Sequence, residues 1–218
     1  MSLTQRKPRP LTRDSQTLRD DRLFIIACDD TYAPKQYFGF FRLIRVQVHV
    51  IPTTMGDSSA KHVLERLLGT ECDIDDQLWL MLDTDHCIQE EHKPGFLQAI
   101  SEARRRGVNI ALSRPSFELW LLLHHVDDSD VVSLQNAEQV EKKLREVLGE
   151  YNKTQLKQEH FPLSSVIRAY KRAEKLDTQV GGGDVPEQNT SRVYLLWRAI
   201  ISEALASQLP AELLELKN

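Results

Sequence analysis

The stretch QLWLMLDTDH, residues 77–86, decides the fold, because a continuous apolar run ends there in two aspartates one residue apart. Short apolar runs of this kind are typical of strands buried on both faces, as in a parallel sheet. Two ionised carboxylates so close together repel each other unless they share a proton or bind a cation. The stretch therefore predicts a central strand with a charged site at its carboxyl end.

Strand patterns and helical patterns alternate over residues 22–126. Strands are expected at 22–28, 45–51, 77–83 and 108–113, and helices at 34–44, 58–69, 94–107 and 115–125. This alternation is typical of a mainly parallel sheet with helices on both faces. The predicted fold class is therefore α/β, with the run at 77–83 inside the sheet.

The rest of the chain carries helical patterns, and no further strand is expected. Amphipathic helices are expected at 134–148, 163–176 and 191–208, and the glycine-rich stretch 181–184 is expected to be a flexible connector. The chain is thus divided into a core at 22–126 and a C-terminal helical part at 127–218 that packs on it. Residues 1–21 are basic, and they form either a flexible tail or an arm that contacts phosphate or a partner.

The composition sets limits on the function. The chain has 218 residues, a formal net charge of −4 and three cysteines. There is no overall basic field, although a local groove or bound metal ions can still hold phosphate. The absence of a Cys-x-x-Cys motif, an apolar signal core and a membrane-length apolar run predicts a cytoplasmic protein. No GxxxxGK[ST] motif is present, so any ATP-dependent step would need another chain.

Carboxylates gather where the predicted strands end. Asp29 and Asp30 follow the first strand, Asp83 and Asp85 end and follow the third, and Glu118 comes shortly after the fourth. The carboxyl ends of parallel strands meet at one edge of the sheet, where such folds bind ligands. Oxygen ligands without histidine or cysteine suit Mg²⁺, with Mn²⁺ as the alternative. The sequence therefore predicts a metal site and catalytic carboxylates at this edge.

Each of these residues also has a structural interpretation. Asp30 alone is as readily a helix cap or turn former as a ligand. Capping explains the pair Asp83 and Asp85 less well, because a cap needs one carboxylate. Glu118 lies in an otherwise apolar helix, where an unpaired charge is costly, so a partner for it is expected.

Further polar residues are candidates for substrate contacts. Ser113 is equally a helix cap or a ligand, and His124 is equally a buried core histidine or a site residue. Arg114, Lys153 and Lys171 are cations that could stabilise charge on a leaving oxygen. Lys171 lies on a basic helical face that is either a phosphate track or a solvated surface.

Several strings of residues resemble the RloB family, Toprim-related proteins encoded in bacteria and archaea, often near defence genes. IIACDDTYAPKQYF (25–38) is similar to an apolar strand that runs into a Glu-Gly turn and a Tyr-Phe pair, and LMLDTDH (80–86) to an Asp-x-Asp after a strand. SRPSFELWLLLHH (113–125) resembles a long Ser-Asn-Pro-x-Phe-Glu-x-Trp-x-Leu-Leu-His string, which is the most specific of the three. A closing Thr-x-Val helix has its counterpart in NTSRVYLL (189–196).

The resemblance implies a Toprim-like core and a metal-dependent phosphodiesterase or nuclease acting on DNA or RNA, as the effector of an anti-phage defence system. In that fold an acidic residue after the first strand acts with the Asp-x-Asp pair at one or two Mg²⁺ ions. Carried over by position, Asp83 and Asp85 match the Asp-x-Asp ligands, and Glu118 matches the glutamate of the long string. Asp29 stands where the first motif has glutamate.

The chain departs from this pattern at three positions. Asp29 is shorter than the expected glutamate by one methylene, Asp30 replaces a glycine, and Arg114 replaces an asparagine. Either Asp29 and Asp30 together substitute for the glutamate, or the metal site is altered. The rival hypothesis is a degenerate Toprim-like binding module that works with a partner ATPase. A phosphoacceptor receiver domain fits less well, because the long string has no place in one and no lysine ends a later strand.

Overall fold

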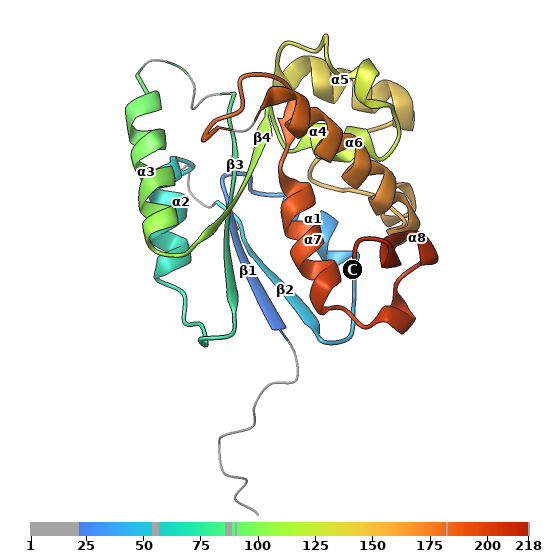
Figure 1. The fold of residues 1–218 in the computed structure, drawn as a ribbon. Helices are drawn as coiled ribbons and strands as arrows, with labels where there is room; N and C mark the ends of the chain where they lie inside the picture. Colours follow the sequence, from blue (N-terminus) through green and yellow to red (C-terminus); the bar gives the residue numbers. More distant parts are fainter. Residues whose placement is uncertain (1–21, 54–56, 86–88, 90, 182, 218) are drawn as a thin grey trace, which may run out of the picture.

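The computed structural model describes residues 22–53, 57–85, 89, 91–181 and 183–217, so the basic arm predicted at 1–21 lies outside the described part. One sheet of five strands has the order β2-β1-β3-β4-β5 (Figure 1). The strands are β1 Arg22–Cys28, β2 Val46–Ile51, β3 Gln77–Asp83, β4 Asn109–Arg114 and β5 Thr190–Ser191. The first four are parallel, and β5 is antiparallel to β4. The prediction of an α/β fold with a mainly parallel sheet and a central strand at 77–83 is confirmed.

Helices cover both faces of the sheet (Figure 1). One face carries α2 Ala60–Leu68 and α3 Lys93–Arg105. The other carries α1 Ala33–Gly39, α4 Glu118–Leu123, α5 Ala137–Leu148, α6 Val166–Val180, α7 Val193–Glu203 and α8 Ala211–Leu214. Short 3₁₀ helices span Asp128–Asp130, Gln158–His160, Leu163–Ser165 and Ala206–Gln208. The helices after residue 126 therefore pack on one face of the sheet.

The central strand is apolar throughout because successive side chains enter two different cores. Met81 packs in the core under the C-terminal helices, while Leu80 and Leu82 pack in the core under α2 and α3. Successive side chains of a strand point to opposite faces, so a strand covered on both sides must be apolar at every position. Asp83, the last residue of β3, interrupts this pattern, and it lies where the strand leaves the core.

Element boundaries follow local signals where these are strong. Ser59 caps α2 as expected, since its Oγ accepts the backbone N–H of His62 at 3.4 Å. Gly107 adopts φ +73 after α3, a conformation that glycine reaches at little cost. In contrast, the helix expected at 34–44 ends at Gly39, because Phe41 leaves the helix to pack edge-on against Trp197.

Two expectations about the second half of the chain were wrong. A fifth strand exists where none was expected: Thr190 and Ser191 pair with Arg114 and Ser113 at the end of β4. Two residues are too few to produce a strand period in the sequence. The helix expected at 115–125 is reduced to α4, because the residues before Glu118 form a turn.

No helix in the ranges that the structure describes is both long enough and apolar enough to span a bilayer.

Candidate functional site

The carboxyl ends of β1, β3 and β4 lie next to one another. In the sheet register Cys28 of β1 is opposite Met81 of β3, and Asp83 of β3 is opposite Ser113 of β4. The acidic residues that follow these strands therefore reach the same edge, as predicted. They line a cavity of about 230 Å³, here called the acidic cavity, formed by Asp29, Asp30, Ser58, Asp83, Asp85, Ser116, Glu118, Ala137, Glu141 and Lys153.

Asp29 bridges the ends of β1 and β3. Its Oδ2 accepts the backbone N–H of Asp83 at 2.9 Å. Burial raises the pKa of Asp29 from its ordinary value of 3.8 to about 7, and the charges of Asp30 and Asp85 add to this effect. The hydrogen bond from Asp83 opposes the shift but does not cancel it. Near neutral pH this carboxyl is therefore poised between its acid and its anion.

Asp83 is buried among other carboxylates, which repel its negative charge. Burial raises its pKa well above the ordinary value, and the charges of Asp29, Glu118 and Asp85 raise it further. Carboxylates that raise one another's pKa in this way bind protons or a cation, because either one relieves their repulsion. The cavity therefore favours a positive ligand.

Asp30 forms the turn that starts α1. Its Oδ1 accepts the backbone N–H groups of Tyr32 at 2.5 Å and Ala33 at 2.8 Å. Its Oδ2 forms an ion pair with Lys153 Nζ at 3.2 Å. Burial lowers the pKa of Lys153, but the charges of Asp30 and Glu118 outweigh this, so the pKa is raised and the side chain is a cation. The structure thus supports the turn-forming interpretation of Asp30.

Glu118 has the partners that its apolar surroundings demanded. The side chain is buried, and its Oε2 accepts the hydroxyl of Ser116 at 2.8 Å while its Oε1 accepts the hydroxyl of Tyr151 at 3.0 Å. Burial and the charge of Glu118 raise the pKa of Tyr151, so its hydroxyl keeps its proton and donates it. The two hydroxyls thus fix the side chain of Glu118 at the cavity wall.

The sequence analysis missed five residues of this site: Ser58, Ser116, Ala137 and Glu141, which line the cavity, and Tyr151, which bonds Glu118. The Ser-x-Glu spacing of Ser116 and Glu118 was a usable signal, since it puts the serine hydroxyl 2.8 Å from the carboxylate. Glu141 and Tyr151 come from α5 and the loop after it, and no pattern links them to the strand ends. Glu141 pairs with Arg145 at 2.5 Å, which directs it along its own helix.

The acidic cavity suits a hard divalent cation, since its aspartates and glutamates offer the oxygen ligands that such ions prefer. Within the part of the chain that the structure describes, however, no three Asp, Glu, His or Cys side chains stand together as a ready metal-binding set. The oxygens of Asp30 and Glu118 point to protein donors instead. A cation would therefore need some carboxylates to turn toward it.

The family model described as RloB-like protein matches residues 24–200. The chain belongs to the RloB family. The match includes β1 from Phe24 onward, the other four strands and all residues of the acidic cavity. The comparison with curated proteins found no match, and the comparison with solved structures found none either.

Four polar residues singled out in this RloB-family chain lie outside the acidic cavity. Ser113 Oγ is 2.9 Å from Ser191 Oγ, so it links β4 to β5. Arg114 donates to the carbonyl of Pro186 at 2.9 Å. Lys171, on α6, pairs with Glu215 at 3.0 Å. The fourth residue, His124, lies in the core. The structure therefore does not place any of these four side chains in the lining of the acidic cavity, although Ser113 and Arg114 end β4.

His124 is fully buried in a chain of hydrogen bonds. Its Nε2 is 3.0 Å from the hydroxyl of Tyr37, and its Nδ1 is 2.7 Å from Ser165 Oγ. Ser165 donates its own proton to the carbonyl of Pro162 at 2.7 Å, so His124 Nδ1 must be the donor to Ser165 and Nε2 must accept from Tyr37. Burial lowers the pKa of His124 well below its ordinary value, which keeps the ring neutral. The structure therefore supports the interpretation of His124 as a buried core histidine.

We expect His124→Phe to lower the free energy of unfolding by about 1–3 kcal/mol, because the hydroxyl of Tyr37 and the acceptor site on Ser165 lose a partner while buried. Urea titration followed by circular dichroism measures this. His125→Phe is the control, since the buried Nε2 of His125 has no hydrogen-bond partner among the described residues, and its replacement should cost little. Equal losses in the two variants would contradict the assigned network.

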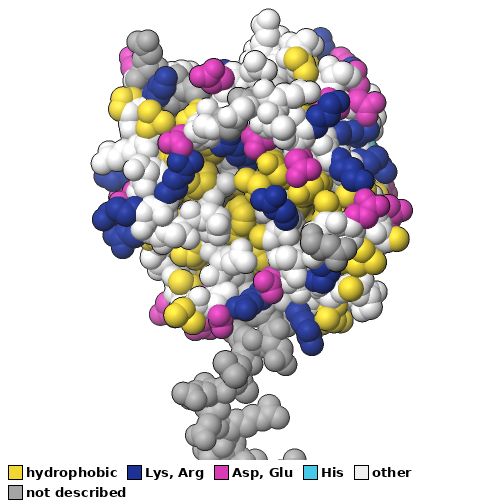
Figure 2. Space-filling view, in the orientation of Figure 1, with side chains coloured by type: hydrophobic (Ala, Val, Ile, Leu, Met, Phe, Trp, Pro, Cys, Tyr) yellow, Lys and Arg dark blue, Asp and Glu magenta, His cyan; other side chains and the backbone are white. Residues whose placement is uncertain are grey.

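The basic side chains of α6 contact the end of α4 and the segment that follows it. Arg172 donates to the carbonyl of Leu123 at 2.8 Å and pairs with Asp127 at 2.6 Å. Lys175 pairs with Asp128 at 2.7 Å. Over the face of the molecule shown in Figure 2, basic and acidic side chains are intermingled rather than gathered in one basic stripe. The cations of α6 thus already have protein partners.

The raised pKa of Asp29 predicts how stability varies with pH. Between its ordinary pKa of 3.8 and its folded value of about 7, the folded chain holds a proton that the unfolded chain releases. Stability of the metal-free protein should therefore fall as pH rises through this window, by at most about 1.4 kcal/mol per pH unit for each such group. Urea midpoints at pH 5 and pH 7.5 test this. Asp29→Asn should show a smaller difference between the two pH values, and a wild-type midpoint at pH 7.5 that is no lower than its midpoint at pH 5 would contradict the prediction.

Proposed function

We propose that this RloB-family protein is a metal-dependent phosphodiesterase of the Toprim type that hydrolyses DNA or RNA. One observation carries the proposal: carboxylates from three separate parts of the chain, Asp29, Asp83 with Asp85, and Glu118, line one cavity with Lys153 beside them. A cluster that raises the pKa of its own members destabilises the fold, and such sites are typical of function rather than of packing.

Asp29, Asp83 and Asp85 would hold Mg²⁺ or Mn²⁺, since they lie at adjacent strand ends and burial makes two of them strongly dependent on a counter-charge. Asp30 is the weaker candidate ligand, because both of its oxygens already have donors. A bound divalent cation would supply polarisation of a phosphate and activation of water.

The remaining side chains have roles that follow from their contacts. Glu118 is fixed at both oxygens by Ser116 and Tyr151, so it would orient an attacking water or complete the ligand set with little rearrangement. The Nζ of Lys153 is held at the cavity by Asp30, and its positive charge would stabilise the leaving oxygen. These assignments make Glu118 and Lys153 catalytic residues alongside the aspartates.

The proposal extends to the setting in which the protein acts. As a cytoplasmic RloB-family nuclease it would be the effector of an anti-phage defence system, with a nearby-encoded ATPase as partner. The sequence carries no P-loop of its own, which is why any nucleotide-dependent control would need that second chain.

A cleavage assay tests the proposal. The full chain is incubated with end-labelled single- and double-stranded DNA and RNA, with Mg²⁺, with Mn²⁺, or with chelator, and cation binding is measured separately by calorimetry. We expect cation binding, and cleavage of at least one nucleic acid in the presence of cation and none with chelator. Cation binding without cleavage of any of the substrates, or no cation binding at all, would overturn the proposal.

A second candidate function is favoured by the ion pair between Lys153 and Asp30. This pair already places a cation beside the acidic cavity, and the described carboxylates do not form a ready metal-binding set. A degenerate Toprim-like module of this kind would bind a partner ATPase instead of cleaving nucleic acid. In that case Asp83→Ala would leave partner binding unchanged in a co-purification assay, and no cation would bind to the wild type.

A further inference from the structure

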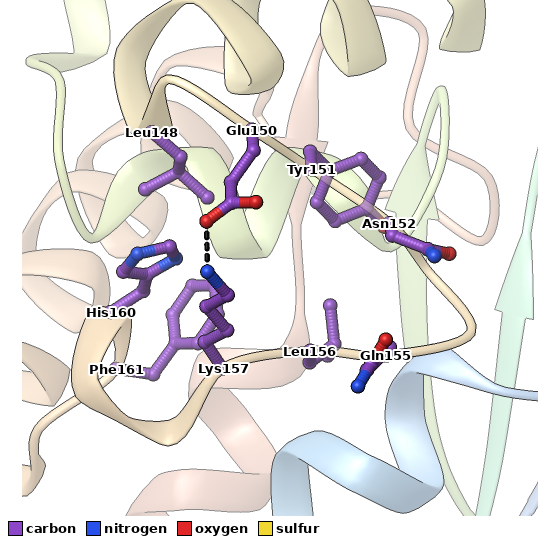
Figure 3. Close-up of a pocket in the computed structure, with 9 residues that line it drawn as sticks. All are labelled: Leu148, Glu150, Tyr151, Asn152, Gln155, Leu156, Lys157, His160 and Phe161. Carbon is purple, nitrogen blue, oxygen red and sulfur yellow. Dashed lines mark hydrogen bonds and ion pairs between the residues drawn. The ribbon is translucent and has the colours of Figure 1, made fainter.

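A second cavity is connected to the acidic one through Tyr151, which lines it and bonds Glu118. It has a volume of about 140 Å³ and is enclosed by the end of α5 and the segment that follows, from Leu148 to Phe161 (Figure 3). We call it the loop cavity. Nothing in the proposed hydrolysis uses it, so its chemistry needs a separate account.

Tyr151 is shared by the two cavities. Its side chain lines the loop cavity, while its hydroxyl donates to Glu118 Oε1 in the wall of the acidic cavity. Lys153 follows two residues later and lines the acidic cavity. One tyrosine side chain therefore separates the two spaces, and a ligand that filled both would place one group on each side of that ring.

The lining of the loop cavity suits a flat, polar-edged ring. Tyr151, His160 and Phe161 provide aromatic surfaces, and Asn152 and Gln155 bring side-chain amides to its rim (Figure 3). Nucleobases are bound in this way in single-stranded nucleic acids, by stacking on aromatic side chains and hydrogen bonding along their edges. The loop cavity thus has the chemistry of a base pocket beside a phosphate site.

An ion pair lies across the loop cavity. Glu150 and Lys157 face each other from its two sides (Figure 3). Their side chains are 65% and 45% exposed, respectively. Ion pairs this exposed to water contribute little to stability, so a ligand can separate them at small cost. Lys157 would then be available to a base edge or to a neighbouring phosphate.

The volume decides which base fits. A cavity of about 150 Å³ admits a single benzene-sized ring. The loop cavity, at about 140 Å³, therefore matches the size of one six-membered ring better than that of the fused pair of a purine. We propose that the loop cavity takes one pyrimidine base of a single-stranded nucleic acid whose adjoining phosphodiester lies in the acidic cavity. This inference rests on the proposed function and names its substrate class.

Single-stranded oligonucleotides of twelve nucleotides, made as DNA and as RNA, test the inference. One set is all purine, one carries a single central pyrimidine, and one carries an abasic site at that position. Binding is followed by fluorescence anisotropy without added divalent cation, and cleavage is followed with Mg²⁺ or Mn²⁺. We expect the pyrimidine oligonucleotides to bind about tenfold more tightly than the other two sets, the size of one stacked base, and to be cut next to the pyrimidine.

Two variants locate the effect. Leu156→Trp should fill the loop cavity and abolish the preference for pyrimidine, and Gln155→Ala, at an exposed position where folding is not at risk, should weaken it. Gln188→Ala, at an exposed glutamine outside the lining, is the matched control. Cation-dependent cleavage indifferent to the pyrimidine would overturn the inference and leave the proposed function standing. Absence of both binding and cleavage for every oligonucleotide would also overturn the inference, and it would overturn the proposed function only together with a failure to cleave double-stranded substrates.

Discussion

The Asp83→Ala/Asp85→Ala variant is expected to lose divalent-cation binding and all cation-dependent cleavage of nucleic acid. Both residues line the acidic cavity at the end of the central strand, and burial and the neighbouring carboxylates raise the pKa of Asp83 well above its ordinary value. Removing Asp83 therefore takes away a ligand that a counter-cation would stabilise. Loss of an outer partner of a metal ligand typically costs about 10–100-fold in affinity or activity, so loss of two ligands should exceed that.

Calorimetric titration with Mg²⁺ and with Mn²⁺, at a pH near 7.5, measures the loss directly. The control is Asp75→Ala/Asp76→Ala, a pair of carboxylates at the opposite end of the same strand, where Asp75 pairs with Arg22. That control should bind cations as the wild type does. Equal binding by the wild type and the Asp83→Ala/Asp85→Ala variant would show that the acidic cavity is not the cation site, whatever its charge suggests.

The placement of the acidic residues could be predicted because it depends on one long-range rule. Once the apolar run at 77–83 is taken as a central parallel strand, its carboxyl end is expected at the same edge of the sheet as that of the strand ending at Cys28, and the structure shows that the two strands are neighbours. Asp29 and Asp83 then meet whatever the loops do, and they are joined by a 2.9 Å hydrogen bond. Strand burial and strand order alone bring these two residues together.

The positions of the other site residues depend on packing between helices, and such packing produces no periodic pattern in the sequence. Tyr151 and Lys153 reach the cavity from a loop after α5, and their position follows from how α5 packs against α4. Such contacts between separate elements set side-chain positions without any fixed spacing in the chain. The sequence left Lys153 as one of several equivalent lysines, and only its ion pair with Asp30 distinguishes it from Lys171, which pairs with Glu215 on the far side of α6.

The two aspartates that replace the Glu-Gly turn show what sequence reasoning leaves open. A shortened acid followed by a second acid suggests either joint substitution or a damaged site. In the structure the two have different contacts: Asp29 bonds the end of the central strand, whereas Asp30 starts α1 and holds Lys153. The side chain of Asp30 thus forms the turn that the glycine forms in the family pattern, and it also pairs with the ammonium group of Lys153.

Lys153→Met is expected to slow cleavage by about 10²–10³-fold, the usual cost of removing one group that stabilises transition-state charge. Its ammonium lies 3.2 Å from Asp30 and lines the same cavity as Asp83. Methionine keeps the length and the apolar stem of the side chain but removes the charge. Cation affinity should stay the same or rise, since a positive neighbour has been taken away from the acidic cluster. Single-turnover cleavage rates and calorimetry measure the two quantities.

Opposite changes in rate and cation affinity separate a catalytic lysine from a structural one. If Lys153 served only to brace the loop against Asp30, its loss would lower the unfolding midpoint and weaken cation binding together with the rate. Lys171→Met is the matched control, because Lys171 also pairs with one carboxylate at 3.0 Å and is similarly exposed, at 59% against 47% for Lys153. It should leave both quantities unchanged. A cleavage rate in Lys153→Met within about twofold of that of the control would remove Lys153 from the catalytic set, since a catalytic charge contributes far more than this.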